Sequence, residues 1–170
     1  MIALCTLVVT PLLAHAQTPT QSGQAAYGAI AEVVRLLEVD PNTDWTHVNI
    51  EALRQHLIDM DEVTLRSTAT QRNVEGGLEI NVTGAGRTVS AIRQLVVSHA
   101  ATLEMGDTYH ATSTDIPDGA KLGVTARNPS DTKTITRIRA LGFAGIITEG
   151  NHHAQHHIAL ARGESMSHMH

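Results

Sequence analysis

Apolar residues recur with helical spacing in the first part of the chain. Between 25 and 38 they return every three or four residues, which predicts a helix that ends before Asp40-Pro41-Asn42. A second helix is predicted from about 50 to 60, with Asn49 as its N-cap. The apolar stripes of the two helices are Tyr27, Ile30, Val34 and Leu37 in the first and Ile50, Leu53, Leu57 and Met60 in the second.

The remainder of the chain alternates between strand and helix patterns in two similar units, at about 63–105 and 108–149. Each unit has a strand, a turn that contains glycine, a second strand and a helix. The spacing from Thr70 to Leu78 equals that from Thr114 to Leu122, which indicates a duplicated ββα unit.

Within the first unit, Leu78, Ile80 and Val82 alternate with polar residues, which predicts a strand with one face covered by helices. We therefore expect an α+β fold. Two N-terminal helices are followed by the duplicated ββα unit, which forms a four-stranded antiparallel sheet covered by helices. A short histidine-rich helix at 151–162 completes the chain.

The beginning of the sequence has the composition of a secretory signal peptide. An apolar run without charged side chains ends in Ala14-His15-Ala16, a pattern suited to signal peptidase. The run is shorter than the roughly 20 residues that a membrane-spanning helix needs. We therefore expect a periplasmic or secreted protein, with no membrane insertion after cleavage. Its predicted parts are a signal peptide (1–16), a flexible N-terminus (17–24), a single α+β domain (25–163) and a mobile tail (164–170).

Composition narrows the chemistry that the chain can perform. Its single cysteine, Cys5, lies within the predicted signal peptide, which excludes disulfides, iron–sulfur clusters, covalently attached haem and thiolate zinc sites from the mature protein. A net charge of −5 and an aromatic content of 2% argue against nucleic acid as a partner. Histidine is the unusual residue, because the chain has 11 of them against 12 Lys and Arg together.

Four histidines cluster in the run His152-His153-Ala154-Gln155-His156-His157. On a helix they share one face, and His152/His156 and His153/His157 are each one turn apart, the spacing at which two imidazoles reach one ion. No glutamate completes a His-Glu-x-x-His protease motif. A solvated tail with inert histidines is the competing interpretation.

Two histidines and two methionines elsewhere are further candidate ligands. His56 lies at the edge of the apolar face of the second helix, one turn before Met60, and His99 lies near the centre of the apolar stripe of the helix predicted at 88–103. Either histidine could instead be a hydrogen-bonded core residue. A thioether from Met60 or Met105 would favour copper, although methionine at such positions normally serves packing.

These observations favour an exported transition-metal-binding protein that sequesters, delivers or senses the ion. Copper is favoured, and zinc or nickel also suit imidazole ligands. The alternatives are a metal-dependent hydrolase or oxidase that uses the same histidines, non-covalent haem binding, and a metal-free interaction module. A catalytic base could come from Glu149, Asp59 or Asp61. The protein partner is not determined by the sequence.

Overall fold

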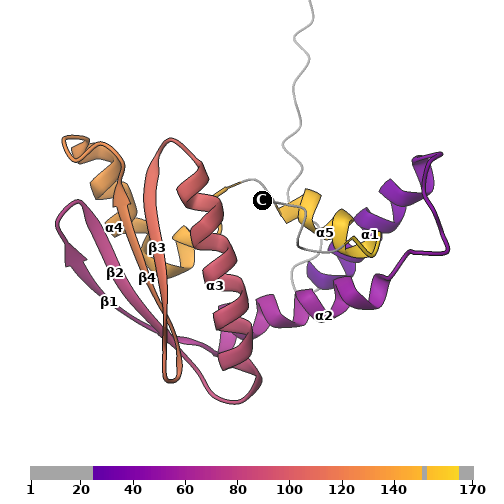
Figure 1. The fold of residues 1–170 in the computed structure, drawn as a ribbon, viewed down its shortest axis with the longest axis horizontal. Helices are drawn as coiled ribbons and strands as arrows, with labels where there is room; N and C mark the ends of the chain where they lie inside the picture. Colours follow the sequence, from indigo (N-terminus) through magenta and orange to yellow (C-terminus); the bar gives the residue numbers. More distant parts are fainter. Residues whose placement is uncertain (1–24, 151–152, 165–170) are drawn as a thin grey trace, which may run out of the picture.

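The computed structural model describes residues 25–150 and 153–164 and confirms an α+β protein with a four-stranded antiparallel sheet (Figure 1). The predicted signal peptide, the flexible N-terminus, and residues 151–152 and 165–170 lie outside the described residues. None of the described helices is long and apolar enough to cross a membrane. The elements are α1 (Ala25–Val39), α2 (Ile50–Asp61), a π-helical turn η1 (Glu62–Arg66), β1 (Thr68–Val74), β2 (Gly77–Thr83), α3 (Arg87–Met105), β3 (Tyr109–Ile116), β4 (Gly119–Ala126), α4 (Thr132–Ile146) and α5 (His153–Ala161).

The sheet consists of two hairpins that pair through their second strands. The strand order is β1-β2-β4-β3, and every neighbouring pair is antiparallel. Ile80 of β2 lies opposite Leu122 of β4 at the centre of the sheet, and both are fully buried against α3 and α4. Leu78 and Val82 are buried on the same face, whereas Asn81 between them is partly exposed. The predicted alternation is therefore present, and helices cover one face of the sheet.

The hairpin registers differ from the register that the sequence spacing suggested. Leu122 lies opposite Ser113, whereas Leu78 lies opposite Asn73, much closer to its own turn. The position in the first hairpin that matches Leu122 is Ile80, so pairing Leu78 with Leu122 was wrong by one inward-facing position. The register of a hairpin is set by its turn and by the face that is buried. Because side chains alternate with a period of two, aligning two strands with an offset of two residues still places apolar residues on the same face.

The glycine that begins the second strand of each hairpin lies against the other hairpin. A Cβ atom on Gly77 would overlap with the carbonyl oxygen of Val124, and one on Gly119 would overlap with that of Val82. A side chain at either position would therefore separate β2 from β4 at that end of the ladder. Glycine at these two positions permits the central strand pair to form along its full length.

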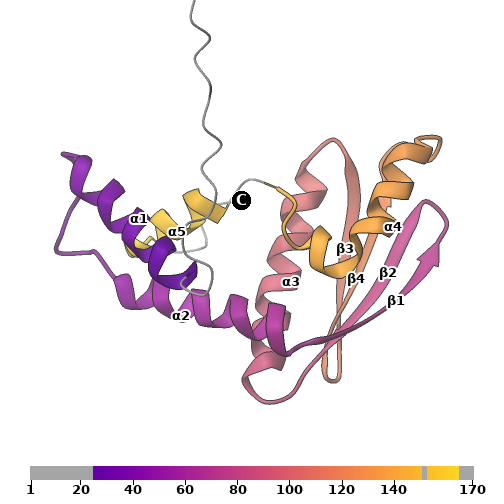
Figure 2. The ribbon, with the colours of Figure 1, turned by 180° about the vertical axis from the view of Figure 1, so that it is seen from behind.

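A second, smaller hydrophobic core lies between α1, α2 and α5, to the right of the sheet in Figure 1 and to its left in Figure 2. Its buried members are Val33, Leu37, Leu53, Leu57 and Ala161. The predicted stripe of the first helix was wrong at one end, because Tyr27 is 76% exposed and Val33, which the stripe omitted, is buried.

Asn49 caps α2 as predicted, and its side chain accepts a hydrogen bond from the backbone N–H of Ala52 (2.9 Å). That a single domain spans 25–163 stays a prediction.

Polar contacts attach the end of α2 to the start of α3. Arg87 Nε lies 2.7 Å from Asp59 Oδ1, and Arg87 Nη2 donates to Gln55 Oε1 (2.9 Å). The hydroxyl of Thr88 donates to Glu62 Oε2 (2.6 Å). Val63 of η1 is buried in the core beneath the sheet, so α2 and η1 join the two cores.

Candidate metal-binding site

The candidate site lies where α5 packs on α2. The helical spacing that buries Leu53 and Leu57 in the smaller core also turns His56 inward, and this side chain is 8% exposed. On α5, Ala161 is fully buried and Ile158 packs against the same core. This packing orients the preceding turn of α5 toward α2.

Three imidazole rings meet at this helix pair. The ring centroid of His56 lies 4.6 Å from that of His156 and 5.4 Å from that of His157, with interplanar angles of 69° and 67°. The centroids of His156 and His157 are 6.3 Å apart. His157 is 9% exposed, and His156 is partly exposed. The structure therefore brings one histidine of α2 together with two of the predicted run.

The distances between the three ring centroids are compatible with ligation of one shared ion, whereas the present orientations of the rings are not. An ion about 2.0–2.1 Å from each of two imidazole nitrogens, at a tetrahedral angle, puts the ring centroids roughly 5 Å apart. The three observed separations bracket that value. In the described part of the chain, no group of three His, Cys, Asp or Glu side chains is arranged so that it could hold a metal ion. Ligation by these rings would need rotation about their side-chain torsions.

The other predicted ligands lie in different parts of the structure, and some of them lie outside the described residues. Met60 packs at the edge of the smaller core, one turn after His56. His152 lies outside the described residues, and for His153 only the backbone position at the start of α5 is described. Met105 is the last residue of α3 and is 66% exposed.

His99 belongs to the core beneath the sheet and not to the α2–α5 cluster. It is 4% exposed, and its Nε2 lies 2.8 Å from the carbonyl oxygen of Ile146, so this nitrogen donates the hydrogen bond. The bond attaches α3 to the end of α4. This contact fits the alternative of a structural core histidine, and the role of His99 as a metal ligand stays a prediction.

Two of the three carboxylates considered as catalytic bases form ion pairs with arginine. Asp59 is paired with Arg87, as described above. Glu149 forms a two-bond pair with Arg137, with Nη1–Oε2 and Nη2–Oε1 distances of 2.8 Å each. Asp61 ends α2 and is exposed.

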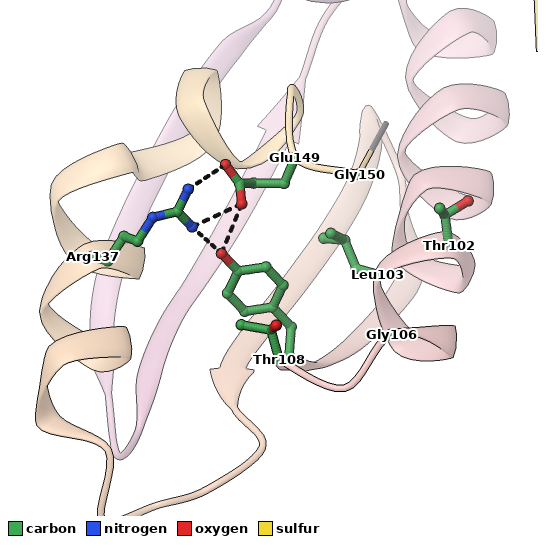
Figure 3. A pocket seen from close by; sticks show the side chains of 8 residues that line it. Thr102, Leu103, Gly106, Thr108, Arg137, Glu149 and Gly150 are labelled. Carbon is green, nitrogen blue, oxygen red and sulfur yellow. Dashed lines mark hydrogen bonds and ion pairs between the residues drawn. The ribbon is translucent and has the colours of Figure 1, made fainter. Parts of the chain in front are cut away.

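Glu149 lines a shallow pocket of about 260 Å³ beside α3 and β3 that the sequence did not predict (Figure 3). Figure 3 shows Arg137 beside its carboxylate. The Tyr109 hydroxyl donates to Glu149 Oε2 (2.8 Å). The hydrogen bonds from Arg137 are the main cause that lowers the pKa of Glu149. Burial, followed by the contact with Glu149, raises the pKa of Tyr109. No local motif links these residues, because they come from β3, α4 and the segment after α4.

Comparison of the chain with models of protein families, with curated proteins and with solved structures gave no significant match.

Proposed function

We propose that this protein binds a transition-metal ion between α2 and α5, with His56, His156 and His157 as the central ligands. The observation that carries the proposal is the meeting of three imidazoles from two segments, with ring centroids 4.6 to 6.3 Å apart. Three histidines in contact at a helix interface are an unusual way to fill apolar space, because aliphatic side chains pack there without polar atoms.

The available ligands indicate which ions fit. Imidazole suits copper, zinc and nickel, and affinity for such ligands is highest for Cu(II) in the usual order of the divalent ions. His153 precedes His157 by one helical turn and is the natural fourth ligand, with His152 as the alternative. The thioether of Met60 would favour Cu(I), and so copper stays the favoured ion.

The contacts of the candidate carboxylates favour a protein that binds a metal ion without catalysis over a metal-dependent enzyme. Asp59 and Glu149 hold arginine side chains, which leaves neither as a general base beside the cluster. The predicted signal peptide supports a periplasmic or secreted location, where a metal-binding protein sequesters, delivers or senses its ion.

Metal titration of matched variants tests the proposal. The metal-free protein is titrated with Zn(II), Cu(II), Ni(II) and, under reducing conditions, Cu(I), beside His56→Ala, His156→Ala and His110→Ala. His110 is the control, because it belongs to β3, its side chain is 58% exposed and it pairs with Glu104. We expect submicromolar binding that His56→Ala and His156→Ala weaken at least tenfold and that His110→Ala leaves unchanged. Equal, micromolar or weaker binding by all four proteins would refute the proposal.

We also infer that the two ββα units are copies of one ancestral unit. The support is their common element order and the reciprocal positions of Gly77 and Gly119 in the sheet.

A further inference from the structure

The position of α5 suggests what metal binding would do to the protein. This helix has nine residues, from His153 to Ala161, and an isolated helix of that length is marginally stable in water. Its helical state therefore depends on its packing against α1 and α2. Any interaction made only by the packed helix shifts the equilibrium between docked and undocked α5.

Polar and ring contacts hold α5 at its C-terminal end and at its middle. At its C-terminal end, the backbone N–H of Asn49 donates to the carbonyl oxygen of Ala161 (2.7 Å), and Arg162 Nη2 lies 2.5 Å from Asp40 Oδ2. At the middle of the helix, His156 and His157 contact His56. The histidine cluster thus forms the part of the docking interface that a metal ion would reinforce.

The segment before α5 is attached to the other core. Arg137 and Tyr109 hold the carboxylate of Glu149, four residues before the start of α5. Figure 3 shows Glu149 beside Arg137. Docked α5 therefore joins the α/β part of the molecule to the helical part at a second place, beside the covalent connection through α2, η1 and β1. If α5 undocked, only the connection through α2, η1 and β1 would hold the two parts of the molecule together.

We infer that metal binding controls the docking of α5, so that the protein acts as a metal sensor and not as a passive store. This inference rests on the proposed function. An ion held by His56 of α2 and by His156 and His157 of α5 requires the docked helix, because the two sets of ligands belong to different elements. The loaded protein keeps α5 docked, and the metal-free protein opens there more often and exposes the apolar surface around Leu53 and Leu37.

The size of the effect follows from mass action. An ion that binds only the docked state multiplies its population relative to the undocked state by one plus the ratio of free ion to Kd, or about 100-fold at 100 times Kd. Amide hydrogen exchange of α5 should slow by the same factor where exchange proceeds through undocking.

The experiment measures exchange and Zn(II) binding on the same samples of the full chain. Peptides covering 153–161 report on α5, and peptides from β4, which lies in the other core, are the internal control. We expect Zn(II) at 100 times its Kd to slow exchange in α5 by about 100-fold and to leave β4 unchanged. In His56→Ala this change should disappear, and His156→Ala, at a partly exposed position, provides the same test if His56→Ala does not fold.

The possible results separate the two proposals. Zn(II) binding without a change in α5 exchange would overturn the sensor inference and leave the metal site intact. Absence of Zn(II) binding would overturn both. Arg162→Ala removes a docking contact but no proposed ligand, so it should speed exchange in metal-free α5, and Zn(II) should slow it again. Failure of Zn(II) to do so would also contradict the inference.

Discussion

His56 of α2 and His156 of α5 lie edge to face, with ring centroids 4.6 Å apart and an interplanar angle of 69°. The two residues are far apart in the sequence, and each belongs to a helix that contributes apolar side chains to the smaller core. Their contact is therefore a property of helix packing. It makes the histidine cluster sensitive to substitutions that move α5, as well as to substitutions of the rings.

The first prediction concerns the fourth ligand. If His153 completes the site, His153→Ala should weaken Zn(II) binding about 10- to 100-fold, whereas His152→Ala should have a small effect, because His153 and His157 are one helical turn apart. Competition with a chromophoric chelator measures both affinities. The opposite ranking would assign the fourth position to His152.

The second prediction concerns His99, which the structure places in the core beneath the sheet. His99→Leu should lower the free energy of unfolding by about 1 kcal/mol, because the carbonyl oxygen of Ile146 loses the hydrogen bond from His99 and keeps only the one from the backbone N–H of Glu149. Urea unfolding measures this loss, with His110→Leu at an exposed position as the control. Metal stoichiometry and affinity in His99→Leu should match those of the unaltered protein, and a lost ion would contradict the assignment.

The third prediction is a dependence of stability on pH through Glu149. The pKa of this carboxyl is lowered from its ordinary value of 4.5, chiefly by hydrogen bonds from Arg137. A lowered pKa means that the ion pair stabilises the fold above pH 4.5 and that this contribution is lost as the pH falls through the lowered value.

Glu149→Gln should therefore be less stable than the unaltered protein by about 1 kcal/mol at pH 7, a modest value because Arg137 is half exposed. The difference should shrink as the pH is lowered from 5 to 3, as followed by urea unfolding at each pH. Glu75→Gln in the exposed turn between β1 and β2 is the control for the loss of a charge. A difference that is constant over this range would exclude a role for ionised Glu149.

The fourth prediction compares two glycine substitutions. Gly77→Ala should lower the free energy of unfolding by more than about 2 kcal/mol, because the new methyl group overlaps with the backbone of Val124 in the central strand pair. Gly28→Ala in α1 has open space around the methyl group and should raise it by roughly 0.5–1 kcal/mol. Thermal or urea unfolding of the two variants measures the decrease and the increase in the free energy of unfolding in one experiment. A neutral Gly77→Ala would show that β2 and β4 separate there at little cost.

Local sequence patterns predicted the α+β class, the antiparallel sheet of four strands, the N-cap at Asn49 and the buried face of β2. These features depend on the period of apolar residues and on short-range hydrogen bonds, both of which the sequence displays directly. The predicted apolar stripe failed at Tyr27, because the end of α1 extends beyond the core that α2 and α5 provide.

The pocket at Arg137 shows what local patterns do not predict. Arg137 is an ordinary exposed helix residue by its spacing, and Tyr109 is an ordinary strand residue. Only the packing of α4 on the sheet brings both to Glu149, which follows the end of α4. Side chains from three separate segments have no common sequence signature.

The sequence by itself determined that histidines gather between His152 and His157 on a short amphipathic segment, and that His56 and His99 each face inward from a helix. It left open which of the two joins the run, because both satisfy the same helical period. The tertiary structure decided this by packing α5 on α2, through Ala161 and Ile158, while α3 buries His99 against α4. The physical reason is that periodicity specifies the face on which a side chain lies, whereas the neighbour of that face depends on contacts between distant segments.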